Sequence, residues 1–310
     1  TMNNVTIQNT QGQAHMILLY GGALKDGEDS YKPVRHTLNN VNVLDNTQCY
    51  DVPVYLYSDN SNAYESWLLY SGQCDTTMTN CEISGNVSTS TSNNDGVGAL
   101  YIHKSNVTMT GCKIRNNQGG NGTIRLLSPS ELIGRGTQTE CTLTMENCTV
   151  TRNTSRNAAI YVGRRDCYRE TLNVVGSTIS NNTNTTESGG AVRGNVLSTL
   201  NITGSTLSNN TAAKYGGAVY AEAYDTAAGN SRTNLTDCTI TGNKAQYGGG
   251  VYLARFNLPD KSSDNKTYIH VFSEQGNTNQ SLMIQGGNIE DNTATNNGGG
   301  ISLDINTCSA

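Results

Sequence analysis

The chain is built from a repeat whose internal spacing is constant. The strings TLNVVGSTISNN (171–182), TLNITGSTLSNN (199–210), TNLTDCTITGN (233–243) and SLMIQGGNIEDN (281–292) superpose without gaps, and five earlier segments follow the same template. One column of this alignment is always aliphatic: Ile7, Val43, Ile83, Ile114, Val150, Ile179, Leu207, Ile240 and Ile289. The column five residues earlier is always apolar: Met2, Leu38, Met78, Met109, Met145, Val174, Ile202, Leu235 and Ile284. Two apolar columns in a fixed repeat predict stacked units that share one continuous core.

Two further columns predict the corners of each unit. Between the apolar columns, every residue is Asn, Gly or Asp: Asn4, Asn40, Asn80, Gly111, Asn147, Gly176, Gly204, Asp237 and Gly286. These residue types tolerate a left-handed backbone, so we expect the chain to turn there between two short strands. Three residues after the aliphatic column stands an asparagine in eight units: Asn46, Asn86, Asn117, Asn153, Asn182, Asn210, Asn243 and Asn292. Side-chain amides stacked about 4.8 Å apart form a hydrogen-bonded ladder, which we expect at this second corner.

A third strand is expected where Gly-Gly precedes an apolar pair, as in 189–192, 216–219, 248–251 and 298–301. Three short strands per unit predict an all-β fold, a right-handed single-stranded parallel β-helix of about nine coils. We expect one domain over 1–310, with insertions near 11–36, 47–76, 119–140, 154–170, 221–233 and 252–281. Because Thr1 already lies inside a repeat, we also expect the chain to be a fragment of a longer protein.

Composition limits the classes of partner. Charged residues make up only 15% of the chain, hydrophobic residues 35%, and the formal net charge is −5. Without a dense run of Lys and Arg, we expect neither nucleic acid nor an anionic membrane surface as a partner. The longest apolar run, Met16–Tyr20, is far shorter than the roughly 20 residues of a spanning helix, so no membrane span is expected in this fragment. We expect a monomer.

The combined pattern [Ile/Val/Leu]-x-x-Asn, a short variable stretch, and Gly-Gly-[Ala/Gly]-[Val/Ile] carries a resemblance. It resembles the repeats of polymorphic outer membrane proteins and related β-helix surface adhesins. That resemblance implies an extracellular or cell-surface location, a role in adhesion or surface display, and no catalytic residues. It rests on a fold-level motif, and a fold alone does not determine function.

The nine cysteines fall into two groups. Cys81, Cys112, Cys148 and Cys238 share a column two residues before the aliphatic one, which points inward, so we expect small core residues rather than a metal-binding row. A zinc site needs converging ligands, which a linear stack does not offer. The remaining pairs, Cys49 with Cys74 and Cys141 with Cys167, bracket loops outside the template, and we expect each pair to form a disulfide. Cys308 is left over.

Catalytic chemistry has little support in the sequence. Polysaccharide-active β-helix enzymes, lyases or hydrolases, are the alternative class, and their carboxylates should recur in one column of adjacent coils. No such column exists, and the histidines show no ligand spacing, so we expect no catalytic residue, no cofactor and no metal. The densest charged segment contains Arg164, Arg165 and Arg169, which we treat as a candidate ligand site or a solvated loop.

Aromatic residues gather in the insertion between Cys49 and Cys74, which holds the only tryptophan: Tyr50, Tyr55, Tyr57, Tyr64, Trp67 and Tyr70. Aromatic rings with polar tips suit sugar stacking and protein contacts. The alternative is a satellite core that fixes the insertion to the solenoid. We therefore expect a non-catalytic adhesin or display domain that binds a host glycan or surface protein through loops, with these aromatics as the leading site.

Overall fold

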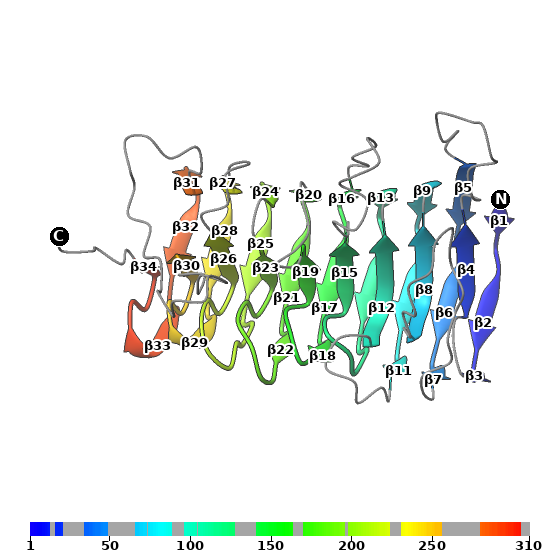
Figure 1. Cartoon of the computed structure of the whole chain (residues 1–310), viewed down its shortest axis with the longest axis horizontal. Helices are drawn as coiled ribbons and strands as arrows, with labels where there is room; N and C mark the ends of the chain where they lie inside the picture. Colours follow the sequence, from blue (N-terminus) through cyan, green and yellow to red (C-terminus); the bar gives the residue numbers. More distant parts are fainter. Residues whose placement is uncertain are drawn as a thin grey trace, which may run out of the picture.

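The computed structural model is a parallel β-helix whose coils follow one another along the long axis of the molecule (Figure 1). It describes residues 1–12, 16–20, 34–48, 66–72, 74–88, 96–103, 105–127, 141–163, 170–195, 198–223, 231–255 and 280–304. Within these ranges the regular structure consists of β-strands, and no helix occurs that is long and apolar enough to cross a membrane. The sequence-based prediction of a β-helix is confirmed.

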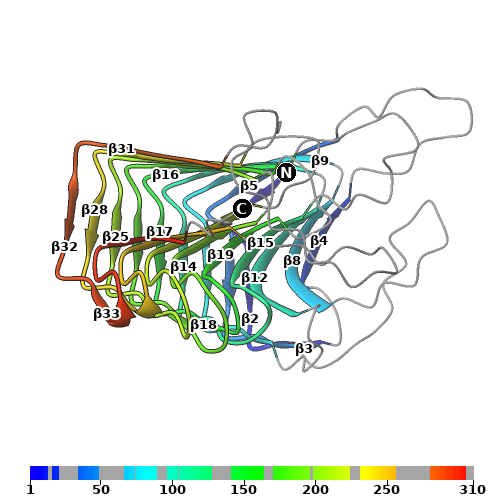
Figure 2. The same cartoon turned by 60° about the vertical axis from the view of Figure 1, so that its left-hand side comes forward.

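Three parallel sheets of nine strands each form the walls, one strand per coil (Figure 2). The first sheet contains β1 (Met2–Asn3), β5 (Val34–Asn39), β9 (Cys74–Thr79), β13 (Asn106–Thr110), β16 (Cys141–Glu146), β20 (Glu170–Val175), β24 (Thr199–Thr203), β27 (Ser231–Thr236) and β31 (Gln280–Gln285). The second sheet contains β2 (Thr6–Gln8), β6 (Asn42–Leu44), β10 (Glu82–Ser84), β14 (Lys113–Arg115), β17 (Thr149–Thr151), β21 (Thr178–Ser180), β25 (Thr206–Ser208), β28 (Thr239–Thr241) and β32 (Asn288–Glu290). The third sheet contains β4 (Ile17–Tyr20), β8 (Ser66–Gly72), β12 (Gly96–His103), β15 (Ile124–Leu127), β19 (Ile160–Val162), β23 (Val192–Gly194), β26 (Val219–Ala223), β30 (Val251–Arg255) and β34 (Ile301–Asp304).

Short strands add local pairing at the corner between the second and third sheets: β3 (Gln11–Gly12), β7 (Thr47–Gln48), β11 (Val87–Ser88), β18 (Thr154–Ser155), β22 (Thr183–Asn184), β29 (Lys244–Tyr247) and β33 (Thr293–Asn297). Four of the third-sheet strands, β4, β8, β15 and β19, lie inside the ranges 11–36, 47–76, 119–140 and 154–170 that were expected as insertions. Their coils are therefore regular over part of those ranges.

Strand pairing keeps equivalent residues in register from coil to coil. In the second sheet Ile83 pairs with Val43 on one side and with Ile114 on the other. Side chains alternate across each strand, so these aliphatic residues all point into the interior, where they join one buried cluster with inward residues of the other two sheets. The apolar columns of the sequence thus correspond to the continuous core of a solenoid.

Both corners adopt the left-handed backbone that their residue types favour. Every member of the Asn/Gly/Asp column between the first and second sheets has a positive φ, from 51° at Asn80 to 66° at Gly286. At the next corner the positive φ falls on the residue just before each ladder asparagine, as at Asn181 and Asn209. The ladder asparagines from Asn46 to Asn243 are buried, and Asn292 is partly exposed.

The asparagine ladder forms as predicted. Asn182 Nδ2 donates to Asn210 Oδ1 at 2.9 Å and to the carbonyl of Val150 at 3.0 Å, and its backbone N–H also donates to Asn210 Oδ1. The same bonds recur at the neighbouring rungs from Asn46 to Asn243. Since each amide both donates and accepts within the corner, the buried polar groups there are satisfied.

The inward cysteine column is confirmed as part of the core. Cys81, Cys112, Cys148 and Cys238 are free thiols, each buried, and each donates to a carbonyl of the preceding coil at 3.2–3.5 Å. The described residues contain no group of three or more His, Cys, Asp or Glu that could hold a metal ion. Cysteine fits this column as a small buried side chain whose weak donor finds a carbonyl acceptor.

The two expected disulfides gain no support. Cys141, expected to pair with Cys167, is buried in the core, and its thiol donates to the carbonyl of Ile102 at 3.7 Å. It begins β16 in the first sheet and so belongs to the repeat rather than to a loop. Cys49 and Cys167 lie outside the described residues, and Cys74 is described only by its place at the start of β9.

Candidate functional site

The outward face of the third sheet carries a column of tyrosine and arginine. Strand pairing aligns one such residue from each of six successive coils: Tyr101, Arg125, Tyr161, Arg193, Tyr220 and Tyr252. The Arg125 guanidinium lies 5.8 Å from the ring of Tyr101 and 5.5 Å from that of Tyr161. Alternating cations and aromatic rings at this spacing attract one another, which stabilises the column. We call it the tyrosine–arginine column.

Arg193 is the centre of a polar cluster on this face. Its guanidinium lies 5.1 Å from the ring of Tyr161 and 5.3 Å from that of Tyr220. Nη1 donates to Asn157 Oδ1 at 2.7 Å, and Nε donates to Asn195 Oδ1 at 3.2 Å. A planar guanidinium between two rings, with its edges bonded to amides, is held in one orientation. These residues, with Glu187, Lys214 and Glu222, form the Arg193 cluster.

Two carboxylates approach the same guanidinium from adjacent coils. Nη1 of Arg193 lies 3.6 Å from Glu187, and Nη2 lies 3.7 Å from Glu222, a residue only 3% exposed. Burial acts to lower the pKa of Arg193, but attraction to Tyr161 and to Glu222 outweighs it and raises the pKa above its ordinary value. Arg193 is therefore a permanent cation that balances the buried carboxylate.

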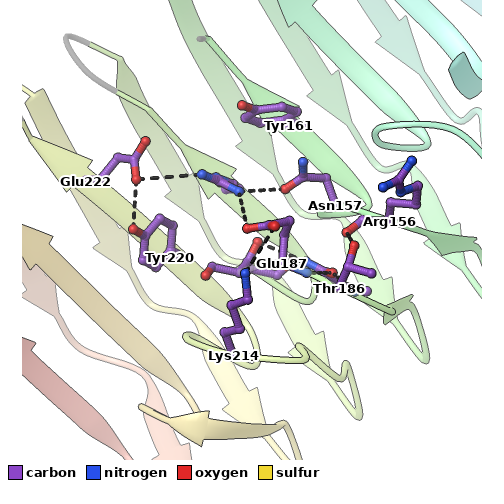
Figure 3. Close-up of polar contacts among 12 residues, drawn as sticks. Arg156, Asn157, Tyr161, Thr186, Glu187, Lys214, Tyr220 and Glu222 are labelled. Carbon is purple, nitrogen blue, oxygen red and sulfur yellow. Dashed lines mark hydrogen bonds and ion pairs between the residues drawn. The ribbon is translucent and has the colours of Figure 1, made fainter. Parts of the chain in front are cut away.

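The rim of the cluster is more open to solvent. Lys214 Nζ lies 3.1 Å from Glu187 Oε1, and the two side chains are 47% and 39% exposed. Deeper in, the Tyr220 hydroxyl donates to Glu222 at 2.7 Å. Figure 3 shows both contacts, Glu222 with Tyr220 and Glu187 with Lys214. The exposed ion pair at the rim can exchange its partners for a ligand, whereas the inner contacts are structural.

A group of four tyrosines adjoins the Arg193 cluster toward the C-terminal coils. Tyr215 lies 4.7 Å from Tyr252 and 5.3 Å from Tyr247 between ring centroids, and Tyr220 stacks on Tyr252 at 6.0 Å. Tyr220 and Tyr252 are buried, while Tyr215 and Tyr247 are partly exposed. We call these four residues the tyrosine cluster. Such ring distances are those of mutually attractive aromatic pairs.

The site residues predicted from the sequence fall mostly outside the described part of the chain. Tyr50, Tyr55, Tyr57, Tyr64, Arg164, Arg165 and Arg169 are all outside it. Trp67 and Tyr70 are placed only as positions in β8, where they pair with Val97 and Tyr101 of the next coil. The pairing continues the tyrosine–arginine column to Tyr70 by strand position. The aromatic insertion therefore stays a prediction.

The Arg193 and tyrosine clusters were missed by sequence analysis, although a signal exists. In six successive third-sheet strands the residue after the first core aliphatic is Tyr or Arg, as in Val192-Arg193 and Val219-Tyr220. The repeat template covers only the strands of the first and second sheets. Segments of variable length separate these strands from the third-sheet strand of the same coil. Likewise, Glu187 and Glu222 share no sequence column, because Glu187 lies in a corner and Glu222 in a strand.

Comparison with known proteins identifies the repeat. Residues 204–222 match the Chlamydia polymorphic membrane protein repeat. No curated protein and no solved structure matches the chain. The matched segment holds β25, the ladder residue Asn210 and the Gly216-Gly217 motif, and it ends at Glu222. Together with the stack of in-register parallel strands, the match supports a β-helix of the polymorphic membrane protein repeat type, a family that implies a surface-exposed, adhesin-like protein.

Proposed function

We propose that the chain is a non-catalytic adhesin or display domain, located at the cell surface or secreted, that binds a host glycan or protein. The observation that carries the proposal is the polymorphic membrane protein repeat at 204–222, set in a stack where the same coil recurs in register. A stiff solenoid holds its outward side chains and loops in fixed positions, which lowers the entropy lost on binding.

The charged groups of the described outer face favour binding over catalysis. Glu187 pairs with Lys214 and Arg193, and Glu222 pairs with Arg193 and accepts from Tyr220. A glycosidase needs two carboxyl groups that face the substrate, whereas both carboxylates here are engaged by cations of the protein itself. Arg193, with its raised pKa, is also unsuited to act as the base of a lyase.

Attachment of the chain to cells tests the adhesive function. Beads coated with residues 1–310 are expected to bind epithelial cell surfaces in a saturable way, and excess soluble chain is expected to compete. Beads coated with the same chain after irreversible thermal unfolding are the control. Equal attachment by folded and unfolded chains, or none by either, would contradict the proposal.

A polysaccharide-active enzyme is the second candidate, because Glu187 and Glu222 do converge on Arg193. A panel of neutral and acidic polysaccharides incubated with the chain separates the two functions. We expect no new reducing ends and no unsaturated products. Cleavage that disappears in Glu187→Gln but survives in the second-sheet variant Glu82→Gln would establish an enzyme instead.

A further inference from the structure

We propose that the tyrosine cluster, with Glu187 and Lys214 at its edge, binds neutral carbohydrate chains. This inference rests on the adhesive function proposed above and specifies its ligand class and site. It uses residues that are described in full, unlike the aromatic insertion between Cys49 and Cys74.

The cluster has an outer and an inner layer of rings. Tyr220 and Tyr252 are 1% and 6% exposed and stack on each other, whereas Tyr215 and Tyr247 are partly exposed. Tyr215 contacts all three other rings, at centroid distances from 4.7 to 6.2 Å. The inner rings thus support the outer ones, so that a ligand meets aromatic surface that is already ordered.

Hydrogen-bonding groups line the same edge of the coils. Strand pairing continues the column of Tyr215 and Tyr247 to Asn297, which is exposed. Exposed Gln246 and Lys214 each stand one residue before a tyrosine of this column, and Glu187 stands beside Lys214. A pyranose ring has an apolar C–H face and a rim of hydroxyl groups. Aromatic faces flanked by amide, ammonium and carboxylate groups satisfy both parts.

The charges of the site select an uncharged ligand. Glu187 lies 3.1 Å from Lys214, and Arg193 lies between Glu187 and Glu222, so two carboxylates and two cations balance. The whole chain carries a formal charge of −5. A sulfated or uronate-bearing chain would therefore gain no net attraction, and long-range repulsion would slow its approach.

The size of the patch favours a carbohydrate over a protein. Specific protein interfaces bury about 1,200–2,000 Å² in total, around a desolvated apolar centre. Here two of the four rings are already buried, and the partly exposed pair is bordered by polar side chains. A column of two rings and an amide, with about 4.8 Å between coils, suits a narrow, extended chain of sugar rings.

Calorimetric titration of the intact chain with neutral oligosaccharides tests the proposal. The probes are homo-oligomers of glucose, galactose, mannose and N-acetylglucosamine, each beside a uronate or sulfated counterpart. We expect saturable binding of at least one neutral series, with a Kd that does not change with salt. The absence of binding by every neutral series, or tighter, salt-dependent binding of an anionic counterpart, would overturn the inference.

Substitutions locate the site. Removing one aromatic face, in Tyr215→Leu or Tyr247→Leu, is expected to weaken binding about fivefold. Tyr247→Phe keeps the ring and is expected to bind nearly as the unaltered chain, and Arg115→Leu on the second sheet is the surface control. Asn297→Ala, an exposed change that leaves the ring stack intact, is expected to weaken binding even if a leucine variant unfolds. Undiminished binding by Asn297→Ala and by a folded leucine variant would refute the site.

Cell attachment separates this inference from the adhesive function. If Tyr215→Leu reduces attachment and enzymatic removal of cell-surface glycans does so equally, the inference stands. If attachment depends on Tyr215 but survives glycan removal, the partner is a protein and the carbohydrate inference is wrong, while adhesion remains. Oligosaccharide binding without any attachment would refute adhesion and leave the site in place.

Discussion

The asparagine ladder has one side-chain amide per coil, at the second corner, from Asn46 to Asn292. Asn182 lies near its middle. Its Oδ1 accepts from the backbone N–H and the Nδ2 of Asn153, while its Nδ2 donates to Asn210 and to the Val150 carbonyl. Asn182 therefore supports polar groups of both neighbouring coils, all of them buried.

We expect Asn182→Ala to lower the free energy of unfolding by about 3 kcal/mol, because it leaves buried donors and acceptors on both sides without partners. Urea denaturation followed by circular dichroism measures the change. Thr178→Ala, an exposed position of β21 in the same coil, is the control and should change stability by less than about 0.5 kcal/mol. Equal effects of the two substitutions would mean that the ladder contributes little.

In the cysteine column, the pKa values of Cys81, Cys112 and Cys148 are each shifted by neighbouring thiols in adjacent coils. Hydrogen bonding with Cys112 lowers the pKa of Cys81 to about 7, and hydrogen bonding to Cys148 and Cys81, together with burial, raises the pKa of Cys112. Cys112 therefore stays a neutral thiol between its neighbours. In-register side chains of parallel strands point the same way, which disfavours the dihedral angle of a disulfide.

We expect Cys81, Cys112 and Cys148 to remain reduced and unreactive in the native protein, even in an oxidising medium. Alkylation before and after unfolding, read by mass spectrometry, checks this: the three thiols should react only after unfolding. The surface of the folded chain gives the reagent almost no access, since each residue is at most 2% exposed. A peptide pair linked through Cys81 and Cys112 would contradict the expectation.

At the scale of the strands, the Gly-Gly motif lies just before the third-sheet strand of a coil, and it allows the backbones of successive coils to approach closely there. A Cβ added at Gly217 would overlap the carbonyl oxygen of Gly249 and lie 2.6 Å from the backbone nitrogen of Lys244. Gly204, at the corner between the first and second sheets, has φ +55° and nothing within 4 Å of the added atom. The two glycines suit their positions for different reasons, Gly217 because there is no space for a Cβ and Gly204 because its backbone has a positive φ.

This difference predicts opposite tolerances. Gly217→Ala is expected to cost about 3 kcal/mol through overpacking against backbone that cannot yield. Gly204→Asn is expected to be nearly neutral, because Asn4, Asn40, Asn80 and Asn147 already occupy the equivalent corner with positive φ. Urea midpoints of the two variants test the contrast, and a tolerated Gly217→Ala would show that the coils can separate at this motif.

How much the sequence could predict differs between the three sheets. The first two are separated by a corner of constant length, so their apolar columns, their left-handed residues and the ladder were all predictable. The third sheet follows segments of variable length, and its strand positions were visible only where Gly-Gly marked them. The Arg193 cluster joins Asn157, Glu187 and Glu222 from three coils, and no single repeat contains that combination. Proximity of this kind follows from stacking rather than from spacing along the chain.

At the scale of the whole molecule, each coil contacts only its neighbours, so a complete coil should be removable. Deletion of 183–210, which is one period of 28 residues, joins Asn182 to Thr211, the residue that pairs with Thr183 in the next coil. We expect the shortened chain to fold with the same strand signal per residue and a lower midpoint of unfolding, because stability sums over coils and their interfaces.

The matched control deletes only 199–210. This deletion removes β24 and β25 but keeps β23, so the third-sheet strand β23 is no longer followed by strands of the first and second sheets. That chain is expected to lose cooperative unfolding. Circular dichroism and size-exclusion chromatography distinguish the two deletions. Unfolding of the 183–210 deletion, or proper folding of both, would contradict a modular stack.

The course of the hydrogen bonds between coils also determines the response to mechanical load. These bonds run from coil to coil along the long axis, as in the 2.9 Å bond from Thr178 N to the Cys148 carbonyl, and the first and last described coils lie at opposite ends (Figure 1). Tension between the ends therefore pulls each interface open directly, instead of shearing strands past one another. A terminal coil detaches first, and release of even the shortest ladder period, the 28 residues from Asn182 to Asn210, lengthens the tether by about 100 Å. Under a pulling force the solenoid extends in discrete steps, so that the remaining coils stay folded while the load falls.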